Sequence, residues 1–473
     1  MRREPAVSPC DVGAVTASHL RKAIGRLPAL PEPLALDLAT RARLVDAGQL
    51  TAHELWAGAQ DWDPTADAAF CALVGALPGS FPLGVVRIGV KDTIDVAGWP
   101  TRLGLRHYRH HPKRNAAVLD GLDPNLMTGK VATTELTLGV GAGCANPYYS
   151  HLDPSTSSTG SAVAVAGFLC DVSLGTDALG CARLPPGACG VVGMRLTHDP
   201  RWHAGIYSTS PPLEAPGWIT RTISDLRFWC GEGMRSAGVP VPRGLEPVGP
   251  APRCIGVIRE ALEDGDAHPA CRAAVLDTVT VLRDAGYDVR EVSLGSLWEA
   301  RASGWELCAR HAWDGYRSVA RQLGDLRAST WAALSVGARI SDERYEQVLD
   351  VIAECPQRAA RAFREESVDA WLLPLAPELP LDVPSAQAME SMFPTPGSDG
   401  FGGGLGYTPI ASVCGLPALT QPVAEAERAP VAMQIIGPRH SEARLLDVAQ
   451  DIERARPAPA MTASARLDTW RTR

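Results

Sequence analysis

The chain has 473 residues, of which 45% are hydrophobic and 21% are charged, so it can form one large core or several ordinary domains, and disorder is excluded as its main state. Its 53 acidic and 45 basic residues give a net charge of −8, which argues against a nucleic-acid partner because non-specific nucleic-acid binders carry a basic surface. No apolar run approaches the roughly 18 residues that cross a bilayer, so no membrane partner is expected.

Residues 36–60 predict two helices, because apolar side chains recur there at three- and four-residue intervals. Thr51 and Glu54 form a capping-box pattern before the second of them. The β-branched run that comes next predicts a strand ending near Lys91, with a turn at Gly98. Lys91 is therefore expected at a strand end.

A stretch rich in Gly, Ser and Thr over residues 128–190 contains an apolar run that fits a helix entering a buried strand. Small residues let a backbone approach a reacting group, so this stretch predicts a ligand-facing loop system. After a Pro- and Gly-rich segment at 234–254, a pattern of strand, helix and strand indicates an α/β sheet. Residues 297–368 are helical by pattern, and an extended apolar segment begins at residue 371.

Twelve cysteines are scattered along the chain without a CxxC pair, which argues against a zinc ribbon and against a short redox motif. Residues 1–10 are not followed by the apolar stretch of a secretory signal. We therefore expect the thiols to be reduced and the protein to be cytoplasmic.

Three motifs carry the candidate chemistry: GVKDTIDVAGWPT around Lys91, DPSTSSTGSAVAVAG around Ser157, and GTDALGCARLPPGACGVVGMR around Cys181. In this order they resemble the three blocks of the amidase signature family. VCGLPALTQPV from 413 and APVAMQIIGPRHSEARLLDVAQDIE from 429 resemble that family's closing strands and helix. The resemblance covers about residues 36–453, and several ordered blocks are more specific than any single motif.

The resemblance implies roles for individual residues. Lys91 matches the family's catalytic lysine, and Ser157 matches its bridging serine, which follows a cis peptide. Cys181 falls at the nucleophile position, because the family's separation of 24 residues from the bridging serine is kept. The resemblance also implies an oxyanion hole made of the backbone N–H groups of Ala178, Leu179, Gly180 and Cys181, and supporting roles for Ser158, Thr176, Asp177 and Arg183.

The sequence departs from the family at several of these positions. The family places serine where this chain has Cys181, so the reacting atom itself is changed. Ser155 and Thr156 stand where a Gly pair is usual, and Thr159 and Leu179 each replace a glycine. These larger side chains are expected to narrow the site or to change the turn.

Amide cleavage needs an activated nucleophile, a proton for the leaving amine and donors for the oxyanion. A buried lysine can move both protons, because desolvation favours its neutral form. By resemblance, Lys91 would take a proton from Ser157, which would relay it from Cys181 and later deliver it to the amine. A thiol nucleophile makes the intermediate a thioester, which amines attack readily.

The sequence thus predicts an amide hydrolase with a Lys91, Ser157, Cys181 triad and with neither a metal nor an organic cofactor. Three alternatives stay open: an acyltransferase with an amine acceptor, a non-catalytic binding protein on the same fold, and an ammonia-releasing subunit like the aminoacyl-tRNA amidotransferase A subunit. The expected partner is a small-molecule or carrier-linked amide substrate. The oligomeric state is left open, with a homodimer as one option.

The expected fold is a single large α/β domain over residues 1–473, in which helices cover a mixed β-sheet core. Within it we expect N-terminal helices at about 36–60, a catalytic core at about 82–233 and 400–453, and an inserted α/β and helical lobe at about 236–398. The basic segment at 102–114 predicts a solvated loop, or alternatively a docking patch for an anionic carrier. The glycine-rich segment at 399–406 predicts a lip of the substrate pocket.

Overall fold

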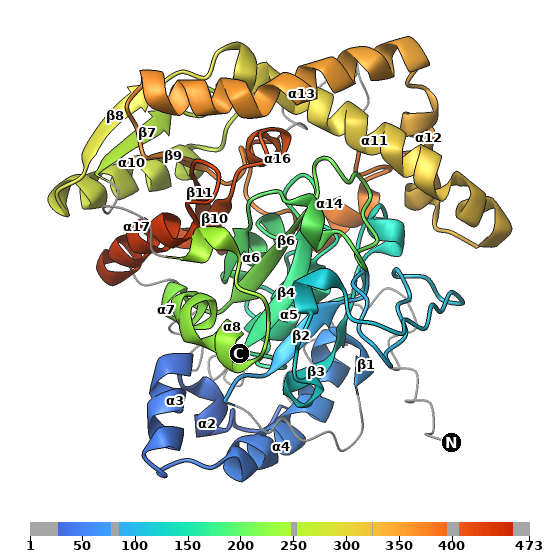
Figure 1. Ribbon diagram of the computed structural model, residues 1–473, viewed down its shortest axis with the longest axis vertical. Coiled ribbons are helices and arrows are strands. Elements are labelled where there is room, and N and C mark those ends of the chain that lie inside the picture. The colour runs from blue at the N-terminus through green and yellow to red at the C-terminus, as the bar shows by residue number, and fades with distance from the viewer. Residues whose placement is uncertain (1–26, 77–84, 247–252, 324, 395–405, 457–473) are drawn as a thin grey trace.

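The computed structural model describes residues 27–76, 85–246, 253–323, 325–394 and 406–456 (Figure 1). Residues 1–10, which were expected to carry no secretory signal, and residues 399–405 of the expected pocket lip lie outside these ranges. Within the described ranges, no helix combines the length and the apolar content needed to cross a bilayer.

One eleven-stranded sheet runs through the described part of the chain, in the order β1-β3-β2-β4-β6-β5-β10-β11-β9-β7-β8. β2 pairs in parallel with β3 and β4, and β7 pairs in parallel with β8 and β9, while the remaining neighbours are antiparallel. The predicted mixed sheet is therefore confirmed. The strands are β1 Leu73–Ala76, β2 Ile88–Lys91, β3 Met127–Val131, β4 Val172–Asp177, β5 Val192–Arg195, β6 Ala215–Thr220, β7 Cys254–Ile258, β8 Asp288–Val292, β9 Ala370–Pro374, β10 Ala418–Ala426 and β11 Ala429–Ile436.

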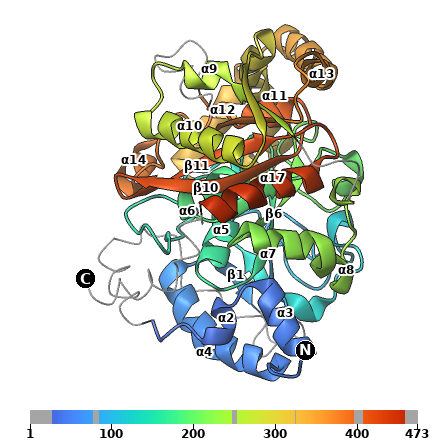
Figure 2. The same cartoon turned by 90° about the vertical axis from the view of Figure 1, so that its left-hand side faces the viewer.

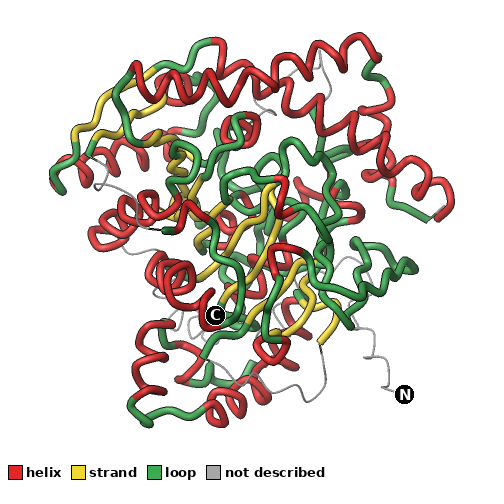
Figure 3. The backbone as a smooth tube through the Cα atoms, in the orientation of Figure 1, coloured by secondary structure: helices red, strands yellow, loops and turns green. Residues whose placement is uncertain are grey.

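Helices lie on both sides of this sheet (Figure 3). The N-terminal helices occupy one end of the molecule, the long helices α11, α12 and α13 the other, and α17 lies beside β10 and β11 (Figures 1 and 2). The helices are α2 Glu32–Ala35, α3 Leu38–Asp46, α4 Ala52–Phe70, α5 Thr159–Ala166, α6 Leu184–Cys189, α7 Ile223–Phe228, α8 Met234–Ser236, α9 Arg259–Leu262, α10 Pro269–Asp284, α11 Ser296–Leu323, α12 Ala328–Ala338, α13 Asp342–Glu365, α14 Val383–Ala388, α16 Pro409–Val413 and α17 Glu442–Ala455.

Local sequence signals explain several boundaries. The two helices predicted at 36–60 are α3 and α4, and α4 begins at the predicted capping box, in which Thr51 Oγ1 accepts from Glu54 N and the Glu54 carboxylate accepts from Thr51 N. The predicted strand ends at Lys91 as β2, and Gly98 takes a positive φ of 80° in the turn that comes next. The strand, helix and strand predicted after residue 254 are β7, α10 and β8.

The segment expected as an inserted lobe contributes β7, β8 and β9, which join the common sheet where β9 pairs with β11. This continuity supports the single-domain prediction, whose boundaries stay a prediction. The basic segment at 102–114 buries Leu103 and Leu105 and exposes Arg106 and His107. Its proposed docking role also stays a prediction.

The cysteines differ in one respect from the expectation. Ten of them are free thiols, but Cys71 is disulfide-bonded, so the expectation of an entirely reduced set is wrong for Cys71. A disulfide depends on whether the fold brings two sulfurs together, and spacing along the chain does not reveal that. The cytoplasmic location stays a prediction.

Candidate active site

The parallel pairing of β2 with β4 brings Lys91 beside the end of β4. In this register Val90 lies opposite Leu174, so Lys91, one residue beyond Val90, and Thr176, two residues beyond Leu174, meet near the carboxyl ends of both strands. Lys91 Nζ donates to Thr176 Oγ1 at 2.9 Å and to Ser157 Oγ at 2.8 Å. The side chain is fully buried. Two expected triad members and one expected supporting residue therefore lie in direct contact.

The surroundings of Lys91 lower its pKa and so shift the side chain toward its neutral form. Desolvation lowers the pKa of this lysine, and the charges of Cys181, Glu214 and Asp177 oppose that shift without cancelling it. Lys91 forms no ion pair with any carboxylate of the described residues. Lys130, the neighbouring buried lysine, differs because its Nζ lies 3.5 Å from Asp92 Oδ1. Lys91 is thus the buried amine that has hydroxyl partners rather than a counter-ion.

Ser157 is held by a turn that differs from the expected one. The described residues contain no cis peptide bond, so the cis peptide expected before Ser157 is absent. The chain turns instead at Ser155, whose φ of 74° lies in the left-handed region and whose N–H donates to Asp153 Oδ1 at 2.8 Å. Thr159 Oγ1 donates to Thr156 O at 2.6 Å and to Ser155 O. Side-chain hydrogen bonds therefore set this turn, at positions where the family has glycines.

Ser158 connects this turn to β4. Its buried hydroxyl donates to Thr176 O at 3.1 Å, close to the turn at residues 178–183, which we call the nucleophile turn after the expected role of Cys181. A Cβ at Gly175 would lie 3.0 Å from Ser158 Oγ, so glycine is needed for this close approach. Ser158 is therefore a positioning residue that fixes the Ser157 turn against the strand that carries Thr176.

Asp177, the last residue of β4, organises the nucleophile turn. Its carboxylate accepts from Arg183 Nε and Nη2, both at 2.9 Å, and from Arg195 Nη1 at 3.1 Å, and all three side chains are fully buried. Burial opposes ionisation of this carboxyl, but the two guanidinium groups outweigh it and hold the pKa of Asp177 well below its usual range. The turn is thus anchored by a carboxylate that stays ionised.

The same carboxylate uses one of the four expected oxyanion donors. Gly180 N donates to Asp177 Oδ1 at 2.8 Å, and Ala182 N donates to Oδ2 at 3.2 Å. Within the described chain, the N–H groups of Ala178, Leu179 and Cys181 have no hydrogen-bond acceptor. The Gly180 N–H, one of the four expected oxyanion donors, is therefore engaged within the turn, and the oxyanion hole stays a prediction that the other three donors can serve.

Cys181 lies at the surface of a small pocket. It is one of two free cysteines in the described chain that are only partly buried, and the other, Cys144, lines neither the pocket nor the cavity next to it. The pocket has a volume of about 30 Å³ and is also lined by Ser157, Thr176 and the nucleophile turn. No hydrogen bond joins Cys181 Sγ to Ser157 Oγ, although both residues are described and line the same pocket. The three expected catalytic side chains are thus gathered, with Cys181 open to a ligand.

Sequence reasoning missed several residues that build the site. Arg195 and Thr408 hold the turn: Thr408 Oγ1 donates to Leu179 O at 2.6 Å, and Arg183 Nη1 donates to Thr408 O at 2.8 Å. Glu214 lines the Cys181 pocket. No local pattern marks these residues, because Thr408 meets Arg183 across 225 positions of the chain.

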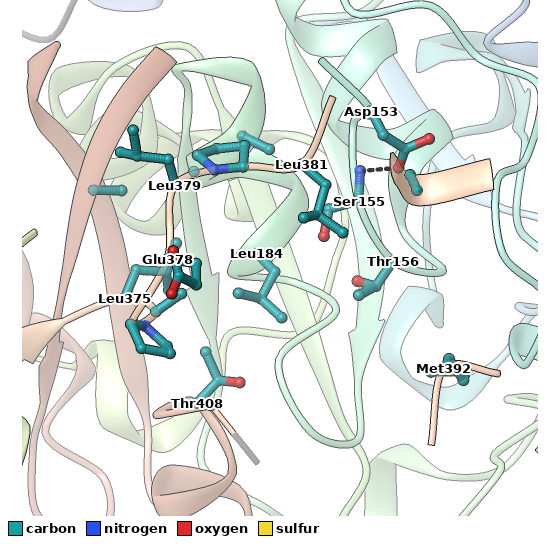
Figure 4. A pocket seen from close by; sticks show the side chains of 18 of the residues that line it. Asp153, Ser155, Thr156, Leu184, Leu375, Glu378, Leu379, Leu381, Met392 and Thr408 are labelled. Carbon is teal, nitrogen blue, oxygen red and sulfur yellow. Dashed lines mark hydrogen bonds between the residues drawn. The ribbon is translucent and has the colours of Figure 1, made fainter. Parts of the chain in front are cut away.

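A larger cavity of about 360 Å³ adjoins the Cys181 pocket, and the two share the lining residues Thr156, Leu184, Trp305 and Met392. Figure 4 shows Leu184 in the middle of this lining, between Leu375 on one side and Thr156 on the other. Most of its lining side chains are apolar, and Gly406, the last residue of the expected pocket lip, belongs to it. The residues expected to be catalytic therefore lie beside a cavity that can hold the apolar part of a small molecule.

Comparisons with known proteins give a family match over most of the chain. Residues 75–446 match the family model described as Amidase. The 2-amino-5-chloromuconic acid deaminase of Comamonas testosteroni is 30% identical over 427 residues, covering 86% of this chain and 88% of that protein. The A subunit of the Glutamyl-tRNA(Gln) amidotransferase of Thermus thermophilus is 27% identical over 425 residues, covering 80% of this chain and 86% of that protein.

Solved structures share the fold over nearly the whole chain. 6-aminohexanoate cyclic dimer hydrolase complexed with substrate has a TM-score of 0.73 at 20% identity, covering 90% of this chain and 98% of that one. The peptide amidase from Stenotrophomonas maltophilia has a TM-score of 0.68 at 20% identity, covering 89% of this chain and 97% of that one. At these identities the likeness bears on the fold alone.

Proposed function

Because the chain belongs to the amidase signature family, as an amidase-type hydrolase of C–N bonds, we propose that it cleaves a carboxamide through a thioester on Cys181. Lys91 and Ser157 move the protons, and no metal or organic cofactor takes part. The substrate is a small amide whose apolar part occupies the cavity of about 360 Å³ beside Leu184.

One observation carries this proposal: Lys91 is buried, has no carboxylate partner among the described residues and donates to the hydroxyls of Ser157 and Thr176. A buried amine without a counter-ion is costly in its charged form. A neutral amine in contact with a hydroxyl is suited to take a proton from it. A binding protein on the same fold has no physical need for this pairing.

The proposed steps balance in protons and electrons. Neutral Lys91 takes the proton of Ser157, and Ser157 takes the proton of the Cys181 thiol. The sulfur then donates an electron pair to the amide carbon, and the carbonyl π pair moves to oxygen. When the C–N bond breaks, Ser157 gives its proton to the leaving nitrogen and regains one from Lys91. Water then attacks the thioester, releasing the acid and the Cys181 thiol.

Three backbone donors support the oxyanion in this scheme, namely the N–H groups of Ala178, Leu179 and Cys181, which no acceptor of the described chain uses. Each such donor typically lowers the barrier by roughly 3–4 kcal/mol. The Asp177 carboxylate keeps the turn in shape through Arg183 and the Gly180 N–H, without touching the substrate.

The test uses two matched cysteine variants. Cys181→Ala removes the proposed nucleophile, and Cys144→Ala removes the other partly exposed free thiol of the described chain, whose Sγ donates to Cys71 O outside both cavities. Incubation with an acyl amide should add the acyl mass to wild type and to Cys144→Ala but not to Cys181→Ala. Turnover that survives in Cys181→Ala would refute the thioester route.

The same experiment separates the alternatives. If an added amine accelerates product formation and appears in the product, the enzyme is an acyltransferase. Turnover that requires a second protein would indicate a role like that of the amidotransferase A subunit, which the Thermus thermophilus relative makes worth testing. A wild-type protein that binds amides but neither gains the acyl mass nor releases product would be a binding protein.

A further inference from the structure

Glu214 is a buried acid that the proposed proton path does not use. The residue directly follows a turn and precedes β6, and the antiparallel register of β6 with β4 places its neighbour Ala215 opposite Asp177. Glu214 therefore lies beside the nucleophile turn. It is 3% exposed and lines the small pocket together with Cys181.

Only one of the two oxygens of the Glu214 carboxylate accepts hydrogen bonds from the described residues. Oε2 accepts from Ser208 Oγ at 3.0 Å and from Thr209 N at 3.3 Å. Oε1 accepts no hydrogen bond from the described residues, and no described lysine, arginine or histidine forms an ion pair with it. Arg195 is near enough to sense its charge, but the hydrogen bonds of that guanidinium go to Asp177, Leu213 O and Leu416 O.

Glu214 is the one charged side chain among the residues that line the pocket, and Lys91, whose pKa the charge of Glu214 raises, lies behind the lining residues Ser157 and Thr176. The lining side chains other than Glu214 are hydroxyls, thiols and apolar groups, including Leu138, Trp305 and Phe393. In such surroundings an anionic ligand group would be repelled by Glu214. A cationic group removed from water would gain both a counter-charge and a hydrogen-bond acceptor.

From this geometry we propose that Glu214 selects amide substrates that carry an ammonium group within a few bonds of the scissile carbonyl. The ammonium donates to Glu214 Oε1 while the carbonyl carbon faces Cys181, because both residues line one pocket of about 30 Å³. The apolar remainder extends past Leu184 into the larger cavity. This inference rests on the proposed function for its substrate class, but the charge preference of the pocket can be measured without turnover.

The first test measures that preference through Cys181 itself. Aminoethyl methanethiosulfonate is cationic and methyl methanethiosulfonate is neutral, and each transfers its thiol half to a cysteine sulfur and releases methanesulfinate. The ratio of their rates at Cys181, followed by mass mapping, should fall about tenfold in Glu214→Gln, because a desolvated unit charge is removed from the pocket. Glutamine keeps the shape and an accepting oxygen for Ser208 and Thr209.

The control variant is Glu366→Gln, which removes the same charge from an exposed position at the end of α13. It should leave the rate ratio at the wild-type value. An unchanged ratio in Glu214→Gln, or an equal fall in both variants, would overturn the proposal, since the effect would then be absent or a property of net charge.

The second test uses a pair of amides that differ only in an ammonium and a methyl group near the carbonyl. Glu214→Gln should reduce kcat/KM for the cationic amide about tenfold relative to the neutral one. Equal losses for both would mean that Glu214 acts on the catalytic groups and not on selectivity. Loss of the thioester in Cys181→Ala is measured separately from the charge preference of the pocket. The proposed function can therefore be refuted while the preference for cationic ligands is confirmed, and the preference can be refuted while the proposed function is confirmed.

Discussion

Replacing Asp177 with asparagine tests whether one buried carboxylate holds the nucleophile turn. The substitution keeps the size of the side chain but turns one accepting oxygen into a donor facing Arg183 or Arg195. Both guanidinium groups are fully buried and would lose their charged partner. Breaking a buried pair by removing one partner costs about 3–5 kcal/mol, because an uncompensated charge remains.

The melting temperature translates this cost into a measurement. An unfolding entropy of about 2.1 cal/mol/K per residue gives roughly 1 kcal/mol/K for the whole chain, so Asp177→Asn should lower Tm by about 3–5 °C. The turn should also lose its shape, since the Gly180 and Ala182 N–H groups lose part of their acceptor. A misplacement of about 1 Å can slow a reaction on the order of 100-fold, and we expect acylation of Cys181 to slow by that factor.

Asp171 provides the matched control, because it directly precedes the first residue of β4, whereas Asp177 is the last residue of that strand. It is fully buried, and its carboxylate accepts from Arg41 Nη1 at 2.6 Å and Arg221 Nη1 at 3.3 Å. Asp171→Asn should lower Tm by a similar amount and leave acylation of Cys181 within about twofold of wild type. If the two variants slowed acylation equally, the Asp177 network would act only through stability, and the reasoning would be refuted.

Three further predictions concern Lys91, Gly180 and acid stability. Lys91→Arg, whose side chain stays protonated, should keep a native circular dichroism spectrum but acylate Cys181 about 10²–10⁴-fold more slowly. The acylation rate of wild type should rise with pH, with a midpoint below the ordinary lysine pKa, and this rise should be absent from the pH–rate profile of Lys91→Arg. Gly180 has a φ of 136°, and a Cβ added there would lie 2.8 Å from Thr408 Cβ. Gly180→Ala should therefore lower the free energy of unfolding, measured in urea, by about 2–4 kcal/mol. The control Gly48→Ala should lower it by about 1 kcal/mol, because φ is positive at Gly48 but the space around it is open. Folding lowers the pKa of Asp177, so the stabilisation by this carboxylate is present above about pH 3.9 and is lost as pH falls through the folded pKa. In urea titrations the difference in unfolding free energy between wild type and Asp177→Asn should therefore shrink below about pH 4. A difference that stays constant would contradict an ionised Asp177 in the folded protein.

The parts of the site that the sequence predicted are those fixed by local pattern. Lys91 was expected at a strand end because Val and Ile precede it, and β2 ends there. Thr51 and Glu54 marked the start of α4 for the same reason, since a capping box involves residues only three positions apart. Such signals survive folding because the atoms involved are neighbours in the chain.

The parts that were missed depend on contacts across the fold. Arg195 and Glu214 reach the nucleophile turn only because β6 pairs with β4 and β5 pairs with β6 in the sheet. No single segment of the sequence reveals this strand order. The cis peptide expected at Ser157 failed for a different reason: it came from the family pattern, whereas Ser155 and Thr159 replace glycines of that pattern and make their own hydrogen bonds.

In the proposed mechanism, a cysteine at position 181, where the family has serine, alters which step most needs Lys91. A thiol, with a reference pKa of about 8.5, loses its proton far more easily than a hydroxyl. A thiol nucleophile therefore depends less than a hydroxyl on proton removal by Lys91. The leaving amine still needs a proton, because an amide nitrogen departs poorly as an anion. The contact of Lys91 with Ser157 therefore matters most when the C–N bond breaks. On this reasoning Lys91→Arg should slow acylation by an amide much more than acylation by a thioester or activated ester, whose leaving groups need no proton.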